Sequence, residues 1–173
     1  AEKKGVKIRQ ADPSDPAQFQ KDLSAFYQIL SETTSRDGFH GHDLQFYRNM
    51  LETLGSKARL HLAEYENQII SGSINTYFKD TSTYYFGASG NSHRNLMAPY
   101  LLHWQIIKDS RAKGFKYYDF FGIAPENSKN HPWQGVTEFK KKFGGTEISY
   151  QQPQEFAFKK SLYLLYKLYK KIR

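Results

Sequence analysis

The chain has 173 residues, enough for one domain with its own hydrophobic core, and a formal net charge of +8. This charge favours anionic partners, such as nucleic acid, nucleotide phosphates or acidic lipid. The absence of cysteine excludes disulfides, thiolate zinc sites and a cysteine nucleophile, and no run of about 20 apolar residues is available to span a bilayer.

The N-terminal part of the chain predicts two helices. The first residues, AEKKGVKIR, are basic and compatible with a helix, and because they begin without methionine we expect a preceding domain. The stretch DPSDPAQFQKDLSAFYQILSETTSRDG opens with cap and turn residues, continues with apolar residues at helical spacing and ends at Gly38, so it predicts a helix. A second helix is predicted over HDLQFYRNMLETLG, with Asp43 as its N-cap and Gly55 at its end.

The following stretch, ARLHLAEYENQIISGSINTYFKDTSTYYFGAS, has the period of β-strands. Its alternating apolar residues, with turn residues at 66–67 and 79–80, predict three antiparallel strands. On the third strand, Tyr84 and Phe86 occupy alternate positions, so we expect them on one face and Tyr85 on the other.

The remainder of the chain returns to alternating helices and strands. MAPYLLHWQIIKDSRAKG predicts a helix, FKYYDFFGI a buried strand, GVTEFKKKFGG a short helix and TEISYQ a last strand. The terminal stretch EFAFKKSLYLLYKLYKKIR predicts a helix that is apolar on one face. Its other face is basic, through Lys159, Lys160, Lys167, Lys170, Lys171 and Arg173. This order predicts a single α+β domain over residues 1–173, with helices flanking a mixed sheet, and its β-β-β-α-β portion is the order of the N-acetyltransferase-like (GNAT-type) fold.

The short helix carries three consecutive lysines beside two phenylalanines. Phe139 and Phe143 lie four residues apart, so we expect them to bury one face of this helix. Lys140 directly follows Phe139 and is the lysine best placed to point into an adjacent cleft. A lysine held near apolar walls can stabilise an anion that develops during acyl transfer, or bind a phosphate. The alternative is a solvated run of lysines.

The block YYDFFGIAPENSKNHPWQGVTEFKKKFGG, with TYYFGAS and LMAPYLLHWQIIKDSRAKG before it, resembles the Fem family of peptidoglycan interpeptide-bridge aminoacyltransferases. The likeness runs through essentially the whole chain and implies the C-terminal half of an enzyme with two acyltransferase-like halves. It implies transfer of an aminoacyl group from aminoacyl-tRNA to the stem-peptide amine of a lipid-linked or UDP-linked muropeptide precursor. The resemblance implies no metal or other cofactor, and it implies a cytoplasmic enzyme.

The resemblance also assigns roles to residues. Lys140 matches the family's catalytic lysine, and Phe139 lies beside it. Tyr84 and Phe86 match a strand where the family places aromatic residues near the reacting groups, although some relatives have tyrosine in place of Phe86. Asp119, at the end of a predicted strand, either orients a catalytic group or caps the following loop.

The segment TSRDGFHGHDLQFYRNM matches the region where the family binds its precursor. His42 falls where the family has an arginine that contacts the nucleotide phosphates, and a histidine is a weaker, pH-dependent phosphate ligand. Three alternatives follow: Arg36 replaces that arginine, Arg48 replaces it, or the natural precursor is lipid-linked. Phe46 and Tyr47 are predicted to be aromatic residues of the pocket or the core.

Two other functions remain open. A coenzyme A-dependent N-acetyltransferase is disfavoured because the turn GNSHRNLMAPY lacks the glycine-rich R-x-x-G-x-G/A pattern and Pro99 removes one backbone donor. The second open function is that of a non-catalytic basic module that binds RNA or membrane. The terminal helix is either docked on the core with a solvated basic side, or attached to the inner face of the plasma membrane, or in contact with tRNA. The histidines show no metal-ligand spacing.

Overall fold

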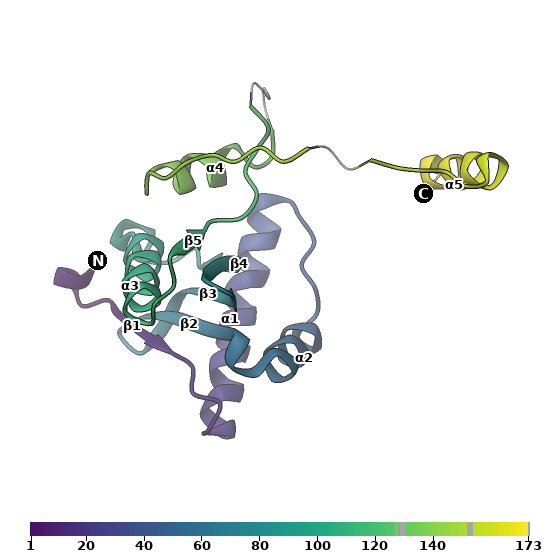
Figure 1. The fold of residues 1–173 in the computed structure, drawn as a ribbon. Coiled ribbons are helices and arrows are strands. Elements are labelled where there is room, and N and C mark those ends of the chain that lie inside the picture. Colours follow the sequence, from purple (N-terminus) through teal and green to yellow (C-terminus); the bar gives the residue numbers. More distant parts are fainter. Residues whose placement is uncertain (127, 129–130, 152–153, 173) are drawn as a thin grey trace. The chain divides into compact units, whose positions relative to one another are not determined.

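The computed structural model of the protein describes residues 1–126, 128, 131–151 and 154–172. Arg173 and the side chains of Lys171 and Ile172, which the sequence places in the basic terminal helix, lie outside this description. The chain forms two compact units, Ala1–Lys142 and Phe143–Arg173, which are described separately (Figure 1).

The first unit is built on a five-stranded mixed sheet in the order β1-β2-β3-β4-β5. Its strands are β1 (Lys7–Gln10), β2 (Ala58–Tyr65), β3 (Gln68–Phe78), β4 (Thr81–Ser89) and β5 (Tyr117–Asp119). Neighbouring strands from β1 to β4 are antiparallel and β4 pairs with β5 in parallel. The three predicted antiparallel strands are therefore confirmed.

Strand β1 was not predicted. The basic opening residues form only a short 3₁₀ turn, η1 (Glu2–Lys4), which ends at Gly5 with φ of 89°. The chain then runs into the edge of the sheet, where Ile8 pairs with Ala63 of β2. A four-residue edge strand shows too few alternations for its period to be read from the sequence.

Helices cover both faces of this sheet (Figure 1). The long α1 (Pro16–Asp37) and α2 (Leu44–Leu54) pack on one face, around a core that includes Phe26, Leu62 and Ile74. On the opposite face, α3 (Ala98–Ala112) packs around Leu102 and Ile106. The short 3₁₀ turns η2 (Gly55–Lys57) and η3 (Arg94–Leu96) precede β2 and α3.

The predicted boundaries of the first two helices are confirmed. The carboxylate of Asp15 accepts a hydrogen bond from the Gln18 backbone N–H at 3.0 Å at the start of α1, and Asp43 accepts one from Phe46 N–H at 2.7 Å at the start of α2. Gly38 ends α1 with φ of 71°, a left-handed conformation that glycine adopts without steric cost.

A β-bulge in β4 changes the direction of its side chains. Tyr84 pairs with Asn75 and Phe86 pairs with Ile74, so Tyr85 is the additional residue. Tyr84 consequently lies against α3, while Phe86 packs on the α1–α2 side. The expectation that Tyr84 and Phe86 share a face was wrong, because the bulge shifts the alternation by one residue.

The segment after α3 is less regular than predicted. The stretch Phe115–Ile123 was expected to be a buried strand, but β5 covers only Tyr117–Asp119 and the ends of that strand are exposed. The short helix is confirmed as α4 (Gln134–Lys141), yet its buried residues are Thr137 and Lys140, and Phe143 lies beyond its end.

The second unit contains the terminal helix α5 (Lys160–Ile172), which confirms the helix predicted there. Residues 146–151 were predicted to form a last strand, but they have no regular structure and are exposed to solvent. Within the part of the chain that the structure describes, no helix combines the length and apolar character needed to cross a bilayer.

Candidate active site around Lys140

Lys140 points into the first unit rather than into solvent. Only 9% of the residue is exposed, and its Nζ donates a hydrogen bond of 2.6 Å to the carbonyl oxygen of Gly122. The same ammonium lies 5.5 Å from the ring centroid of Tyr84, within the range of a cation–π contact. Lys141 and Lys142 are exposed, whereas Lys140 is buried, so the alternative of a solvated run of lysines does not hold for Lys140.

Thr137 explains why Lys140 is on the buried face of α4. The Thr137 hydroxyl donates to the carbonyl of Trp133 at 2.7 Å and accepts a hydrogen bond from the Ala124 backbone N–H at 2.9 Å. The bond with Ala124 ties α4 to the loop after β5, and the bond with Trp133 holds the hydroxyl against the first turn of the helix. Lys140 follows three residues later and therefore lies on the same side of the helix.

Burial lowers the pKa of Lys140 to about 8, and the negative charge of Asp119 opposes this shift. The ammonium is therefore still largely charged at neutral pH. Asp119 also accepts a hydrogen bond of 2.7 Å from the Phe121 backbone N–H. It thus caps the loop after β5, which was one of the two alternatives for this residue, and its charge also acts on Lys140.

His103 on α3 joins the rings around Lys140. Its ring centroid lies 4.3 Å from that of Tyr84 and 5.4 Å from that of Phe139. Its Nδ1 is 2.7 Å from the hydroxyl of Tyr118. The structure therefore brings the three predicted catalytic residues, Lys140, Phe139 and Tyr84, together around a buried histidine.

The sequence indicated no role for His103, beyond the finding that the histidines lack metal-ligand spacing. One signal was available: His103 lies between Leu102 and Ile106 on the apolar face of α3. A polar side chain at a core position of a helix requires a hydrogen-bond partner. That partner, Tyr118, lies on a different element, so the sequence alone could not identify it.

The predicted precursor-binding residues form a second cluster, on the opposite face of the sheet. The ring of His42 stacks on Phe46 with centroids 3.8 Å apart, and Phe86 lies 5.1 Å from Tyr47. Tyr47 is a core residue, and its hydroxyl accepts a hydrogen bond of 3.2 Å from the His42 backbone N–H. His42 and Phe46 are exposed, so they form the accessible edge of this cluster.

The two arginines offered as alternatives to His42 lie in different environments. Arg36 donates to the carbonyl of Ser89 at 3.1 Å and to Asn91 Oδ1 at 2.7 Å. These contacts hold the end of α1 against the end of β4, and neither of them joins Arg36 to His42. The Nε of Arg48 is buried and lacks a hydrogen-bond partner among the described residues.

Aromatic rings connect the second cluster to the surroundings of Lys140. Tyr85, the bulge residue, lies 4.9 Å from Phe86 and 5.2 Å from Phe121 between ring centroids. Phe121 is adjacent to Gly122, whose carbonyl binds Lys140. Because β4 pairs with β5 only over Thr81–Thr83, the two segments are not joined by the sheet ladder beyond this point. Tyr85 and Phe121 therefore link the second cluster to the loop that carries Gly122.

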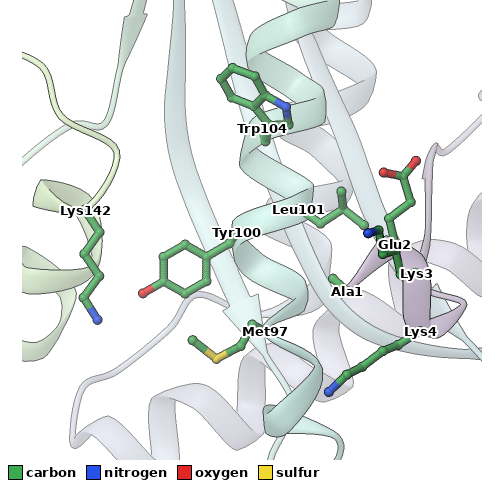
Figure 2. Close-up of a pocket in the computed structure, with 9 residues that line it drawn as sticks. All are labelled: Ala1, Glu2, Lys3, Lys4, Met97, Tyr100, Leu101, Trp104 and Lys142. Atoms are coloured by element: carbon green, nitrogen blue, oxygen red, sulfur yellow. The ribbon is translucent and has the colours of Figure 1, made fainter.

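A separate open groove lies between η1 and α3 (Figure 2). Its lining is mainly apolar, and Lys3, Lys4 and Lys142 are its cationic residues. The other residues that line it are Ala1, Glu2, Met97, Tyr100, Leu101 and Trp104. Tyr100 also packs against Phe139, with ring centroids 5.0 Å apart, so the groove adjoins the Lys140 site without including Lys140.

Within the described residues, no group of three or more His, Asp or Glu side chains could hold a metal ion. The polar groups around Lys140 include the carbonyl of Gly122, the carboxylate of Asp119 and the neutral imidazole of His103.

Comparison with known proteins places these features in context. The sequence profile of the FemAB family matches residues 1–68 and 63–171. Aminoacyltransferase FemA of Staphylococcus epidermidis is 29% identical over 90 residues, which cover 52% of this chain and 22% of FemA. Aminoacyltransferase FemB of the same organism is 27% identical over 84 residues, which cover 47% of this chain and 20% of FemB. The chain thus spans about a fifth of the length of these two relatives.

Solved structures support the fold. The crystal structure of FemX superposes with a TM-score of 0.70 at 18% identity, over 80% of this chain and 50% of FemX. A ribosomal-protein-alanine N-acetyltransferase from Brucella melitensis biovar Abortus 2308 superposes with a TM-score of 0.63 at 11% identity, over 88% of this chain and 100% of that chain. The predicted N-acetyltransferase-like α+β fold is confirmed.

Proposed function

The chain belongs to the FemAB family, and from this membership we propose that it is the C-terminal half of an aminoacyltransferase that forms peptidoglycan interpeptide bridges. The donor is an aminoacyl-tRNA and the acceptor is the stem-peptide amine of a lipid-linked or UDP-linked muropeptide precursor. The observation that carries the proposal is the buried ammonium of Lys140, held by the carbonyl of Gly122 beside the ring of Tyr84.

The reaction requires a nucleophilic amine and a stabilised oxyanion. The neutral acceptor amine attacks the carbonyl carbon of the aminoacyl ester, a C–N bond forms, and the carbonyl oxygen becomes an oxyanion. Collapse of this tetrahedral intermediate breaks the ester C–O bond, and the 3′ oxygen of the tRNA leaves with a proton while the amine loses one. A cation in a dry site stabilises the charge on either oxygen, so Lys140 in its charged form would act on the transition state.

The groove in Figure 2 supports an RNA donor. Single-stranded nucleic acid is bound by lysines that contact phosphates and by aromatic rings on which bases stack. Lys142 and Trp104 line the groove and offer these two groups, and Tyr100 links it to Phe139. The 3′ end of an aminoacyl-tRNA would then approach Lys140 from the α3 side, and the precursor from the side of His42 and Phe86.

The enzyme would act in the cytoplasm, where aminoacyl-tRNA is made. Contact with the inner face of the plasma membrane is proposed through α5. Its four leucines, Tyr166 and Tyr169 are more than half exposed. Its described charged side chains, Lys160, Lys167 and Lys170, are all basic. A helix of this kind binds an acidic lipid surface by lying in it, not by crossing it.

The experiment that tests the proposal is transfer of a labelled amino acid from charged tRNA to the precursor, using the chain alone and joined to a second acyltransferase-like half. Lys140→Ala should lower kcat by about 10² to 10³, with a normal circular dichroism spectrum. Trp104→Ala should instead raise the KM for charged tRNA. The kcat of the unmodified enzyme should fall as pH rises through about 8, because Lys140 then loses its proton.

The matched control is Lys141→Ala, which removes an exposed lysine from the same helix. It should leave kcat within about twofold of the unmodified enzyme. A folded Lys140→Ala enzyme with near-normal turnover would remove Lys140 from the mechanism. Transfer that occurs in neither form of the chain would overturn the proposed function itself.

A coenzyme A-dependent N-acetyltransferase is the competing function, because the fold is shared with such enzymes. Isothermal titration with acetyl-coenzyme A separates the two. Saturable binding with acetyl transfer to a primary amine would favour the competing function, and the absence of heat together with aminoacyl transfer would favour ours.

A further inference from the structure

A series of hydrogen bonds between side chains runs from β3 through β5 to His103 of α3, near Lys140. The hydroxyl of Ser73 donates to Asn75 Oδ1 at 2.5 Å, and Asn75 Nδ2 donates to the hydroxyl of Tyr118 at 3.2 Å. The Tyr118 hydroxyl lies 2.7 Å from Nδ1 of His103. These side-chain hydrogen bonds thus link β3, β5 and α3.

The hydroxyl of Tyr118 can donate a hydrogen bond to the neutral ring of His103. Because the oxygen of Tyr118 accepts from Asn75, its O–H is available to donate to Nδ1. With Nδ1 as the acceptor, the neutral ring carries its proton on Nε2. Burial, together with the nearby charge of Lys140, lowers the pKa of His103 to about 3. A neutral ring leaves Lys140 as the charged group beside Tyr84.

The His103 ring is also the packing surface for the residues that hold Lys140. Tyr84 of β4 meets it edge-on at 4.3 Å, and Phe139 of α4 lies 5.4 Å away. The ammonium of Lys140 lies over the ring of Tyr84, 5.5 Å from its centroid, and Phe139 is the residue before Lys140. A shift of the imidazole would therefore displace both neighbours of the ammonium.

We propose that His103 is a positioning residue: the hydrogen-bond chain that ends on its ring holds Tyr84 and Phe139, and through them Lys140, in place. This inference rests on the proposed role of Lys140 in acyl transfer. The titratable groups around the ring are Tyr84 from β4, Tyr118 from β5, Lys140 from α4 and His61 from β2. Asp119 acts in addition on Lys140.

The test measures the pKa of Lys140 by ¹³C NMR of labelled lysine, with the signal assigned by its loss in Lys140→Arg. In the unmodified protein this pKa should be about 8. Tyr118→Phe removes only the hydroxyl and should return the pKa toward the ordinary value of a solvated lysine. His103→Leu should do the same, and His103→Asn, which keeps an acceptor near Nδ1, should preserve the lowered value.

The chain offers a matched control for the loss of a tyrosine hydroxyl. Tyr77 lies 2.9 Å from Nε2 of His61, another buried histidine whose pKa burial lowers to about 3. Tyr77→Phe should cost similar stability and leave the pKa of Lys140 unchanged. If His103→Leu does not fold, Tyr118→Phe and His103→Asn still carry the test.

In the transfer assay, Tyr118→Phe should lower kcat by roughly 10- to 100-fold with little change in KM. An unchanged Lys140 pKa in folded Tyr118→Phe would overturn the inference, as would equal shifts in Tyr118→Phe and Tyr77→Phe. Because the NMR measurement needs no substrate, failure of the proposed function would be seen separately, as an absence of transfer with the pKa shifts intact.

Discussion

Lys140 combines a charge with burial, and this combination is costly for the folded state. Its exposed fraction is 9%, and its charged form is supported by one carbonyl, one aromatic ring and a nearby carboxylate. A site that needs a cation in a dry environment therefore sacrifices stability, as active sites commonly do.

This cost predicts a stabilising substitution. Below pH about 8, Lys140 is protonated in both the folded and unfolded states, so the folded state bears the full burial penalty. Between about 8 and the ordinary lysine pKa, the unfolded chain binds the additional proton, so the stability of the unmodified protein rises with pH. Lys140→Met should thus increase the free energy of unfolding by up to about 3 kcal/mol at neutral pH.

Urea unfolding of the unmodified protein and of Lys140→Met, at neutral pH and near pH 10, measures the difference in their free energies of unfolding. The contributions of the other titrating groups largely cancel in this difference. The advantage of Lys140→Met should shrink at the higher pH. A Lys140→Met protein that is less stable at both pH values would mean that the bond to Gly122 outweighs the cost of burial.

At the scale of elements, the bulge of β4 divides the two clusters. It sends Tyr84 toward α3 and Phe86 toward α1 and α2. Gly87 leaves the space that Tyr84 needs, since a Cβ on Gly87 would lie 1.7 Å from the Tyr84 hydroxyl oxygen and 2.3 Å from its ring carbon Cζ. The strand therefore needs glycine at this position for Tyr84 to lie beneath Lys140.

Gly87→Ala should force the whole Tyr84 ring to move. We expect a loss of about 1 to 3 kcal/mol in the free energy of unfolding, together with a lower kcat. Gly135→Ala is the control, because a Cβ there has no neighbour within 4 Å and alanine favours the helix. Combining Gly87→Ala with Tyr84→Leu should restore part of the lost stability; no recovery would locate the damage elsewhere.

The terminal helix α5 exposes several large apolar side chains. Leu162, Leu165 and Tyr169 follow one another at helical spacing and are 58%, 61% and 61% exposed. Lys160, Lys167 and Lys170 lie on the other side of the helix, since 100° per residue separates the two sets. This separation of apolar and basic side chains is typical of a helix that lies on acidic lipid.

Co-sedimentation with vesicles checks this surface. The protein should bind vesicles that contain phosphatidylglycerol and not vesicles of phosphatidylcholine alone. Replacing Lys160, Lys167 and Lys170 with serine should weaken binding by about 100-fold, at about 1 kcal/mol for each lysine. Equal binding to both kinds of vesicle would exclude an electrostatic contribution of the lysines to membrane binding. Binding to neither kind would exclude membrane contact.

At the scale of the first unit, an ionic cluster joins β1, α1 and β2. Asp22 on α1 is 2% exposed and accepts a hydrogen bond of 2.7 Å from Arg9 Nη2. Arg9 Nε also donates to Glu64 of β2 at 3.0 Å. The hydrogen bond to Asp22 is the main cause that raises the pKa of Arg9. The cluster attaches the edge strand to the helix that covers it.

Arg9→Leu should therefore lower the free energy of unfolding by about 3 kcal/mol, because it leaves the Asp22 carboxylate buried without its partner. Lys7→Leu, on an exposed position of the same strand, should change it by less than about 0.5 kcal/mol. Denaturant unfolding of the two variants measures both values. If Arg9→Leu and Lys7→Leu changed the free energy of unfolding equally, groups other than Arg9 would be stabilising the buried carboxylate of Asp22.

The sequence alone was sufficient for the features that depend on neighbours along the chain. The caps of α1 and α2, the turns at Glu66–Asn67 and Lys79–Asp80, and the position of α4 all follow from local residue preferences and periods. Lys140 was selected on the same basis, from three lysines beside apolar residues, and the long motif around it predicted the family that the profile comparison confirms.

Only the tertiary structure decided where the side chains meet. The bulge at Tyr85 separates Tyr84 from Phe86, the bond from Tyr118 reaches His103, and the exposed stretch 146–151 has no strand to pair with. Each of these depends on residues far apart in the chain, whose packing and hydrogen bonds exist once the sheet has formed. Local preference determines which elements form, whereas the free energy of long-range contacts determines their register and the pairs of side chains that touch.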